Sequence, residues 1–186
     1  AAYHLLRAGH ACTIFDEHEQ LGGALRSAIS PERLPPDVLD TELDLIVKLG
    51  GAFQPHTQLG RDVSLAQLTN DFNAVVLAMG ALTLERAADL GLALTEHGVS
   101  VDALTGETSR PGVFACGSMT QPLQMAVRAV AAGVRVAHAV TQFLAGARIT
   151  GVHRRFDSMI GRLHDDELAE FLQLSDASAG DVSTDE

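Results

Sequence analysis

The sequence predicts an α/β fold built around a doubly wound parallel sheet. Three short apolar runs, at residues 11–15, 73–80 and 112–117, are continuous rather than alternating, which is typical of strands covered on both faces. Between these runs lie segments whose apolar residues recur at helical spacing, and alternating strands and helices favour a parallel sheet. With 186 residues, 46% of them apolar, the chain is long enough for one domain with a sizeable core.

The first elements are short. Residues 2–8 are expected to form a helix that ends at Gly9, because glycine tolerates the left-handed conformation common after a helix. The run at 11–15 contains β-branched residues and is expected to be a buried strand. A loop follows in which Gly22 and Gly23 allow the backbone to approach another group closely.

A longer helix is predicted after the Pro35-Pro36 pair, which interrupts regular structure. Asp37 is a candidate N-cap, and apolar residues continue at helical spacing as far as Lys48. Gly50-Gly51 then ends the helix.

The next elements lead to the second buried strand. Residues 52–59 are expected to be extended, and Ser64 to cap a short helix through Leu68. The run at 73–80 ends in glycine and is expected to be a strand. Residues 82–111 suggest a small helix followed by hairpin-like segments around 92–94 and 99–101.

The last strand is predicted at 112–117 and a long helix at about 123–144. Together these elements give one domain at 1–148, a helical extension at 149–174 with a helix capped near 164–166, and an acidic tail at 175–186. The tail is small and apolar-poor and is expected to be disordered. Since residues 2–8 already form a helix, the sheet is expected to be truncated at its N-terminal end.

Composition and charge exclude several classes of function. The formal net charge of −11 argues against nucleic acid or an anionic membrane as a partner. Apolar runs fall short of the roughly 18 residues that a membrane helix needs, and no signal peptide is recognisable. Cys12 and Cys116 form no C-x-x-C motif, so no metal or cluster ligand set and no redox disulfide is expected. A cytoplasmic location is the simplest interpretation.

Three strand ends carry candidate binding residues, because ligands of doubly wound sheets lie beyond the carboxyl ends of the strands. Asp16 ends the first run, and a carboxylate there can accept hydrogen bonds from the two hydroxyls of a ribose. Gly80 and Gly117 end the other two runs. Each has an ordinary alternative: Asp16 as a solvated acid, and the glycines as turn residues. No catalytic acid, base or nucleophile is predicted.

Four stretches of the sequence resemble one family. These are HACTIFDEHEQLGGALRSAISPERLPPDVLDTELDLIVKLGGAF, VVLAMG, TSRPGVFACGS and QMAVRAVAAGVRVAHAV. In this order they are similar to the FAD-binding domain of the family that contains the glutamate synthase small subunit and the flavin domain of dihydropyrimidine dehydrogenase. The resemblance covers about residues 1–146 and implies a Rossmann-like sheet of the FAD-binding type.

The resemblance implies a role for each matching position. Asp16 would hold the adenosine ribose, and Arg33 and Leu59 would contact the flavin and adenine sides of FAD. Gly117 and Ser118 would lie by the ribityl chain and pyrophosphate, and the helix start would present N–H groups to the flavin ring. The full set of implied cofactor-binding residues is Asp16, Gly22, Gly23, Ala24, Arg33, Leu59, Gly80, Gly117, Ser118, Gln124, Met125 and Ala126.

The sequence also departs from the family pattern. Ser118 replaces an aspartate, Met79 a threonine, and Ala28 and Ser30 the glycine and proline of G-I-P. The G-x-G-x-x-G turn that holds the pyrophosphate is missing. The segment between Gly80 and Gly117 is also too short for the NADPH-binding domain that relatives insert there, which needs roughly 100 residues.

Two functions are therefore expected as alternatives. The first is an FAD-binding subunit or fragment of an oxidoreductase, relaying electrons through its flavin between the other subunits of a redox complex, with no NADPH site in this chain. The second is a degenerate flavin domain kept as a structural or assembly subunit without cofactor. In either case the strands at 11–15 and 73–79 are expected to need a central strand between them, from upstream residues or from a partner chain.

Overall fold

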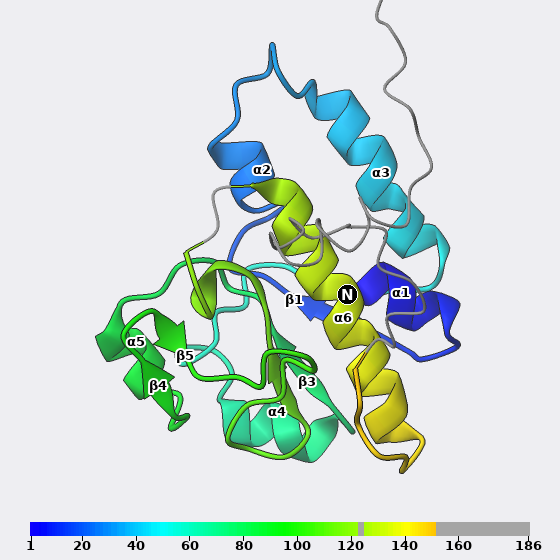
Figure 1. The fold of residues 1–186 in the computed structure, drawn as a ribbon. Coiled ribbons are helices and arrows are strands. Elements are labelled where there is room, and N and C mark those ends of the chain that lie inside the picture. Colours follow the sequence, from blue (N-terminus) through cyan, green and yellow to red (C-terminus); the bar gives the residue numbers. More distant parts are fainter. Residues whose placement is uncertain (123–124, 152–186) are drawn as a thin grey trace, which may run out of the picture. The chain divides into compact units, whose positions relative to one another are not determined.

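The computed structural model describes residues 1–122 and 125–151 (Figure 1). The predicted extension beyond residue 151 and the acidic tail lie outside the described residues. The described elements are α1 (Ala2–Arg7), β1 (Thr13–Phe15), α2 (Ala24–Ser27), α3 (Pro36–Lys48), β2 (Ala52–Gln54), α4 (Leu65–Asp71), β3 (Val75–Leu77), α5 (Leu84–Ala88), β4 (Leu94–Thr95), β5 (Gly98–Val99), β6 (Val113–Ala115), the 3-10 turn η1 (Gly117–Met119) and α6 (Ala126–Leu144).

The strands form two parallel pairs and one hairpin. β1 pairs with β2, with Ile14 opposite Phe53, and β3 pairs with β6, with Val76 opposite Phe114. β4 and β5 form a separate antiparallel hairpin. The prediction of an α/β fold with parallel strands is confirmed, although each predicted apolar run is only partly strand.

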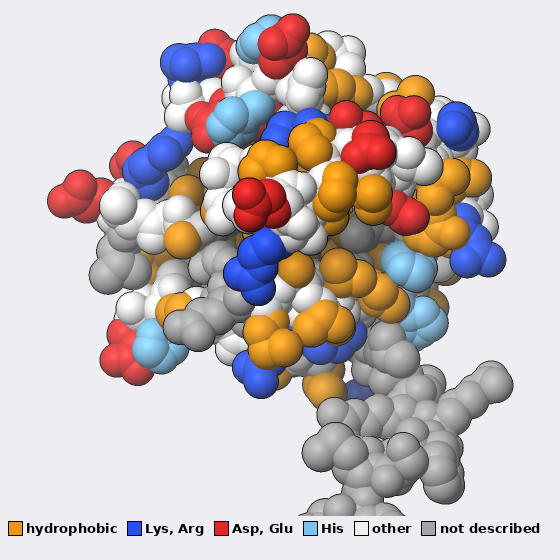
Figure 2. Space-filling model, turned by 90° about the horizontal axis from the view of Figure 1, so that it is seen from above, with side chains coloured by type: hydrophobic (Ala, Val, Ile, Leu, Met, Phe, Trp, Pro, Cys, Tyr) orange, Lys and Arg blue, Asp and Glu red, His pale blue; other side chains and the backbone are white. Residues whose placement is uncertain are grey.

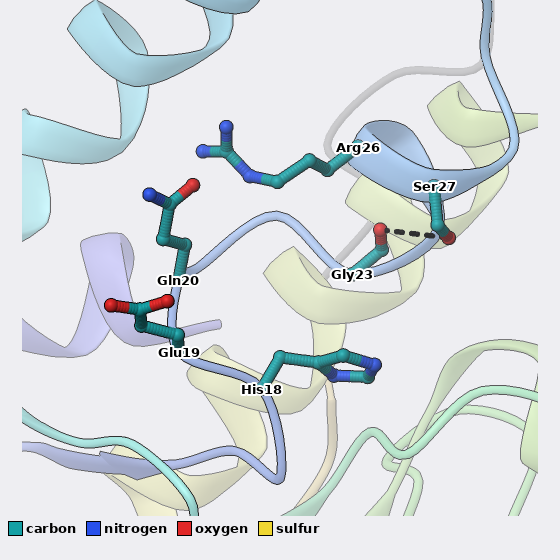
Figure 3. Close-up of a pocket in the computed structure, with 6 residues that line it drawn as sticks. All are labelled: His18, Glu19, Gln20, Gly23, Arg26 and Ser27. Carbon is teal, nitrogen blue, oxygen red and sulfur yellow. Dashed lines mark hydrogen bonds between the residues drawn. The ribbon is translucent and has the colours of Figure 1, made fainter.

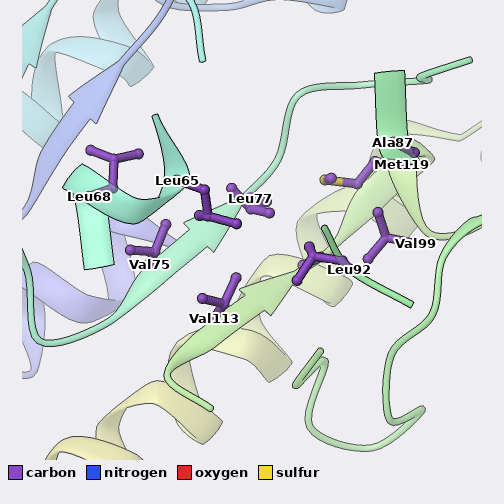
Figure 4. Close-up of a cluster of buried hydrophobic side chains, with 10 residues drawn as sticks. Leu65, Leu68, Val75, Leu77, Ala87, Leu92, Val99, Val113 and Met119 are labelled. Carbon is purple, nitrogen blue, oxygen red and sulfur yellow. The ribbon is translucent and has the colours of Figure 1, made fainter. Parts of the chain in front are cut away.

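Two apolar clusters cover the faces of the parallel pairs. The first is built on β3, β6, α4 and the hairpin region, and it includes Val75, Leu77 and the fully buried Val113 (Figure 4). The second lies under α1 and α6 and includes the fully buried Phe114. Burial on both faces explains why β3 and β6 carry no polar residues at alternate positions.

A capping box and a proline pair mark the starts of two helices, α4 and α3. At α4 the Ser64 hydroxyl accepts from the Gln67 N–H, and the Gln67 side chain accepts from the Ser64 N–H, a reciprocal capping box that confirms the predicted cap. The predicted Asp37 cap of α3 is wrong. Pro35 is the cap residue and Pro36 is in the first turn, where its missing N–H costs nothing, and Asp37 lies inside the helix.

The middle of the chain packs onto β3 and β6. α5 and the β4–β5 hairpin follow β3 and precede β6 along the chain. Their region contributes Ala87, Leu92 and Val99 to the first cluster. The predicted small helix and hairpin are confirmed, with strands at 94–95 and 98–99 rather than 92–94 and 99–101. Gly98 has a φ of +141°, and a Cβ there would run into the Met119 carbonyl, so the hairpin lies directly against η1.

Candidate functional site

Asp16 lies directly after β1, as predicted, and its carboxylate is held by a neighbour. Its Oδ1 accepts from the His18 backbone N–H at 2.9 Å and from the His18 ring Nδ1 at 2.8 Å. The Asp16 side chain is 26% exposed, whereas that of His18 is 65% exposed. These bonds fix the carboxylate at the strand end, where a ligand hydroxyl can approach its second oxygen.

A pocket of about 280 Å³ opens beside this pair. Figure 3 shows His18 at one side and Arg26 at the other, with the Gly23 backbone between them. The side chains of Gln20 and Arg26 point toward one another, and the Ser27 hydroxyl donates to the Gly23 carbonyl at 3.3 Å. The pocket is lined by His18, Glu19, Gln20, Gly23, Arg26 and Ser27.

Arg26 fixes the shape of this pocket. Its Nε donates to the Leu21 carbonyl at 3.0 Å, and its terminal nitrogen forms an ion pair with Asp40 of α3. The guanidinium therefore ties the glycine loop to α3. Neither His18 nor Arg26 was among the predicted site residues. A signal for Arg26 was available, because it is the arginine of the L-G-G-x-L-R pattern.

The predicted glycines fall into two groups. Gly23, Gly80 and Gly117 have φ between +48° and +80°, and a Cβ at any of them would meet no atom within 4 Å. Space in front of these three backbones is therefore open to a ligand. Gly22 differs, because a Cβ there would lie 3.2 Å from Leu39 and 3.3 Å from the Arg26 Nε. Packing against α3 is a sufficient reason for glycine at this position.

The start of α6 is uncovered. The helix begins at Ala126 with Met125 as its cap residue, close to the predicted start, and residue 124 lies outside the described residues. Val127 and Val130 are each 62% exposed. A helix start with several exposed apolar side chains offers both N–H groups and apolar surface to a ligand or partner. η1, which holds Gly117 and Ser118, packs against this helix.

Four other predicted residues do not line this pocket. Ala24 is exposed at the start of α2, and Arg33 is exposed in a turn, its N–H donating to the Ser30 carbonyl. Leu59 is half-buried and packs against the first cluster, while Ser118 is half-buried within η1. The structure shows no contact that joins Arg33 or Leu59 to the pocket.

Hydrophobic side chains lie together near the middle of the face shown in Figure 2, with acidic and basic side chains around them. Within residues 1–122 and 125–151, no three His, Cys, Asp or Glu side chains are placed to share a metal ion. No helix in the same part of the chain is both long and apolar enough to cross a membrane.

Comparison with known proteins gives partial sequence matches. The chain is 42% identical over 81 residues to the glutamate synthase [NADPH] small chain of Mycobacterium tuberculosis, a match covering 44% of this chain and 17% of that protein. It is 37% identical over 98 residues to the NADP(+)-dependent formate dehydrogenase subunit beta of Moorella thermoacetica, covering 53% of this chain and 13% of that one. Over 80 residues it is 38% identical to the NAD-dependent dihydropyrimidine dehydrogenase subunit PreT of Salmonella typhimurium, covering 43% of this chain and 19% of that subunit.

A structural comparison supports the fold. A thioredoxin reductase from Gloeobacter violaceus matches with a TM-score of 0.50 at 14% identity, over 79% of this chain and 91% of that one. At this identity the likeness concerns the fold alone. No protein-family profile matches the chain.

Proposed function

Because the chain is related to the glutamate synthase small chain and similar pyridine nucleotide oxidoreductase subunits, we propose that it is the FAD-binding part of such an oxidoreductase. The observation that carries the proposal is the Asp16 carboxylate, held at the end of β1 beside the pocket that Gly23 lines. A carboxylate at a strand end can hydrogen-bond the ribose hydroxyls of a dinucleotide, and a glycine beside it lets the cofactor approach the backbone closely.

The described residues fit an extended dinucleotide in three respects. The second carboxylate oxygen of Asp16 has no hydrogen-bond partner among them, so it can accept from a ribose hydroxyl. Gly23, Gly80 and Gly117 present backbone that a cofactor can approach without meeting a side chain. The first N–H groups of α6 favour a negatively charged partner.

Each residue would act by holding and orienting the cofactor. Asp16 would hold the ribose, Gly23 would line the cofactor, and Gly117 with Ser118 would lie along its middle. The start of α6 would stabilise negative charge on the group bound there. The bound flavin would supply the electron transfer itself, and this chain would bind it and set its potential. The electron donor and acceptor would be other subunits.

A second candidate is a flavin-type domain that has lost its cofactor and serves in assembly. Ser118 favours it, since a neutral side chain stands where the family has a carboxylate. The exposed apolar start of α6 also suits a subunit contact, with Val127 and Val130 each 62% exposed.

Purification of the native complex separates the two candidates. If the chain binds FAD, the complex shows a flavin absorption spectrum. After the flavin of any other subunit is subtracted, acid extraction releases one FAD for each copy of this chain. The matched variant is Asp16→Asn, which should lower that ratio. A complex that contains the chain without stoichiometric flavin would overturn the first proposal and support the second.

A further inference from the structure

One side of α3 is apolar and yet exposed. Val38, Leu45 and Leu49 are 48%, 39% and 44% exposed. Because an α-helix turns by about 100° per residue, these three positions point in nearly the same direction. They form a single row along the helix, which is called the outer row of α3 below.

The inner face of α3 makes the contacts that hold the helix in place. The Leu39 side chain lies 3.2 Å from where a Cβ of Gly22 would be, and the Ile46 side chain lies 2.9 Å from where a Cβ of Gly51 would be. α1 also packs against this helix. Since Leu45 directly precedes Ile46, the outer row lies about 100° round the helix from this inner face. The outer row is therefore available to another group.

An acidic side chain interrupts the outer row. Glu42 is exposed and lies between Val38 and Leu45, about one helical turn from each. Asp37 and Asp44 are exposed on the side of the row that faces away from the inner face. Within the part of the chain that the structure describes, none of these three carboxylates forms an ion pair.

A carboxylate within an apolar row restricts what can cover it. An apolar partner would remove water from Glu42 without replacing its hydrogen bonds, which is costly. A partner with Lys or Arg opposite Glu42 would supply a charge-assisted hydrogen bond and could still place apolar side chains on the rest of the row. Positions 38, 42, 45 and 49 also have the alternating spacing with which two helices pack side by side, so a helix fits this row.

Charge argues against a second copy of this chain as the partner. The formal net charge of the chain is −11, so two copies repel each other. Within α3 itself, Asp37, Asp40, Glu42 and Asp44 outnumber the single Lys48. Two α3 helices packed through their outer rows would bring like charges together, which suppresses that pairing. The occupant that suits the row is a basic helix from a different chain.

We propose that the outer row of α3 is a docking surface for an amphipathic, basic helix of another subunit. The apolar side chains of that helix would cover Val38, Leu45 and Leu49, and a Lys or Arg would pair with Glu42. This surface goes beyond the proposed cofactor binding and does not depend on it, because it rests on α3 alone.

Photo-crosslinking in the native complex tests which chain covers the row. A benzophenone amino acid replaces Leu45 in one variant and Val47 in the control, and the tagged chain is purified with its partners. Val47 is 54% exposed on the same helix, but it lies about 200° round the helix from Leu45. We expect a cross-link from position 45 alone. Mass spectrometry should place it in another subunit, within a segment whose apolar residues recur at helical spacing beside Lys or Arg.

A charge reversal tests the pairing with Glu42. Glu42→Lys should reduce the amount of that subunit retained on the tagged chain at least about tenfold. Glu96→Lys is the matched control, because it makes the same change in net charge in the turn after β4, where the Glu96 side chain is 84% exposed. It should leave retention unchanged. Urea unfolding of both variants verifies that each is folded.

Several results would overturn the proposal. They are a position 45 cross-link to a second copy, to the chain itself or to a segment without basic residues, the absence of a cross-link in the purified complex, and recovery of the tagged chain without another subunit. Equal retention by the Glu42 and Glu96 variants would also overturn it. Loss of flavin binding alone would leave these results unchanged, so the failure of this proposal is distinguishable from the failure of the cofactor proposal.

Discussion

Asp16 and His18 are joined through a single carboxylate oxygen, since Oδ1 of Asp16 accepts from both the backbone N–H and the ring Nδ1 of His18. Its other oxygen has no partner among the described residues. The carboxylate is thus oriented before any ligand binds, which lowers the cost of ordering it in a complex.

Replacing Asp16 by Asn should weaken FAD binding by about 10- to 100-fold, since hydrogen bonds to a charged group contribute about 1.5–3 kcal/mol. His18→Ala should weaken it less, by a few-fold, because only the orientation of the carboxylate is lost. Titration of the apoprotein with FAD, followed by flavin fluorescence, measures both. Glu17→Gln, an exposed neighbour outside the pocket, is the control. Equal affinity of the Asp16 variant and the control would contradict the assigned role.

Gly98→Ala should destabilise the protein by about 3 kcal/mol or more, because the new Cβ would run into the Met119 carbonyl and the backbone would have to shift. Gly91→Ala is the matched control. Its φ of +65° is also left-handed, but a Cβ there meets no atom within 4 Å, so only about 1–2 kcal/mol is expected. Urea unfolding of both variants gives the difference. Equal losses would show that the hairpin does not lie against η1.

The capping box of α4 offers a second measurement of stability. Gln67→Ala removes the acceptor of the Ser64 N–H and should cost about 0.5–1 kcal/mol. Gln67→Glu keeps an acceptor oxygen at the same place and should be close to neutral at pH 7. Thermal unfolding distinguishes the two. A larger loss for Glu than for Ala would contradict the capping arrangement.

Burial raises the pKa of the Cys116 thiol. Above the ordinary thiol pKa of about 8.5, the unfolded chain loses its thiol proton while the folded chain keeps it, so stability should fall as pH rises from there. Cys116→Ala should make this decline shallower, although burial also raises the pKa of Cys12. The free energy of unfolding between pH 7.5 and about 10 measures the slope. An unchanged slope in the variant would mean that Cys116 titrates alike in both states.

The sequence was most informative where the chain is buried on both faces. The apolar runs around Val76 and Phe114 correctly indicated two paired parallel strands, because continuous burial leaves no polar positions. Strand lengths were overestimated, since glycine and polar neighbours end the ladders early. The Asp37 cap was wrong because the helix already begins at Pro36, whose fixed φ suits the first helical position.

The candidate site could be predicted only in part. Asp16 and Gly23 follow from a strand end and a close-approach loop, and the structure places them within one local region. No sequence pattern reveals His18, because its role arises from loop geometry. Arg26 stands in the L-G-G-x-L-R pattern, but its ion pair with Asp40 on α3 is visible only in the structure. Arg33 and the start of α6 do not line the pocket, and their roles in cofactor binding remain predictions.

The two parallel ladders have a consequence for the order of folding. Thr13 pairs with Ala52 and Val75 pairs with Val113, so each ladder closes a loop of roughly 40 residues that lies wholly within its own half of the chain. Neither ladder depends on backbone bonds from the other. The backbone bonds of the two ladders can therefore form independently of each other, whereas side-chain packing links them, since Phe15 of β1 packs against the cluster that contains Val75 and Val113.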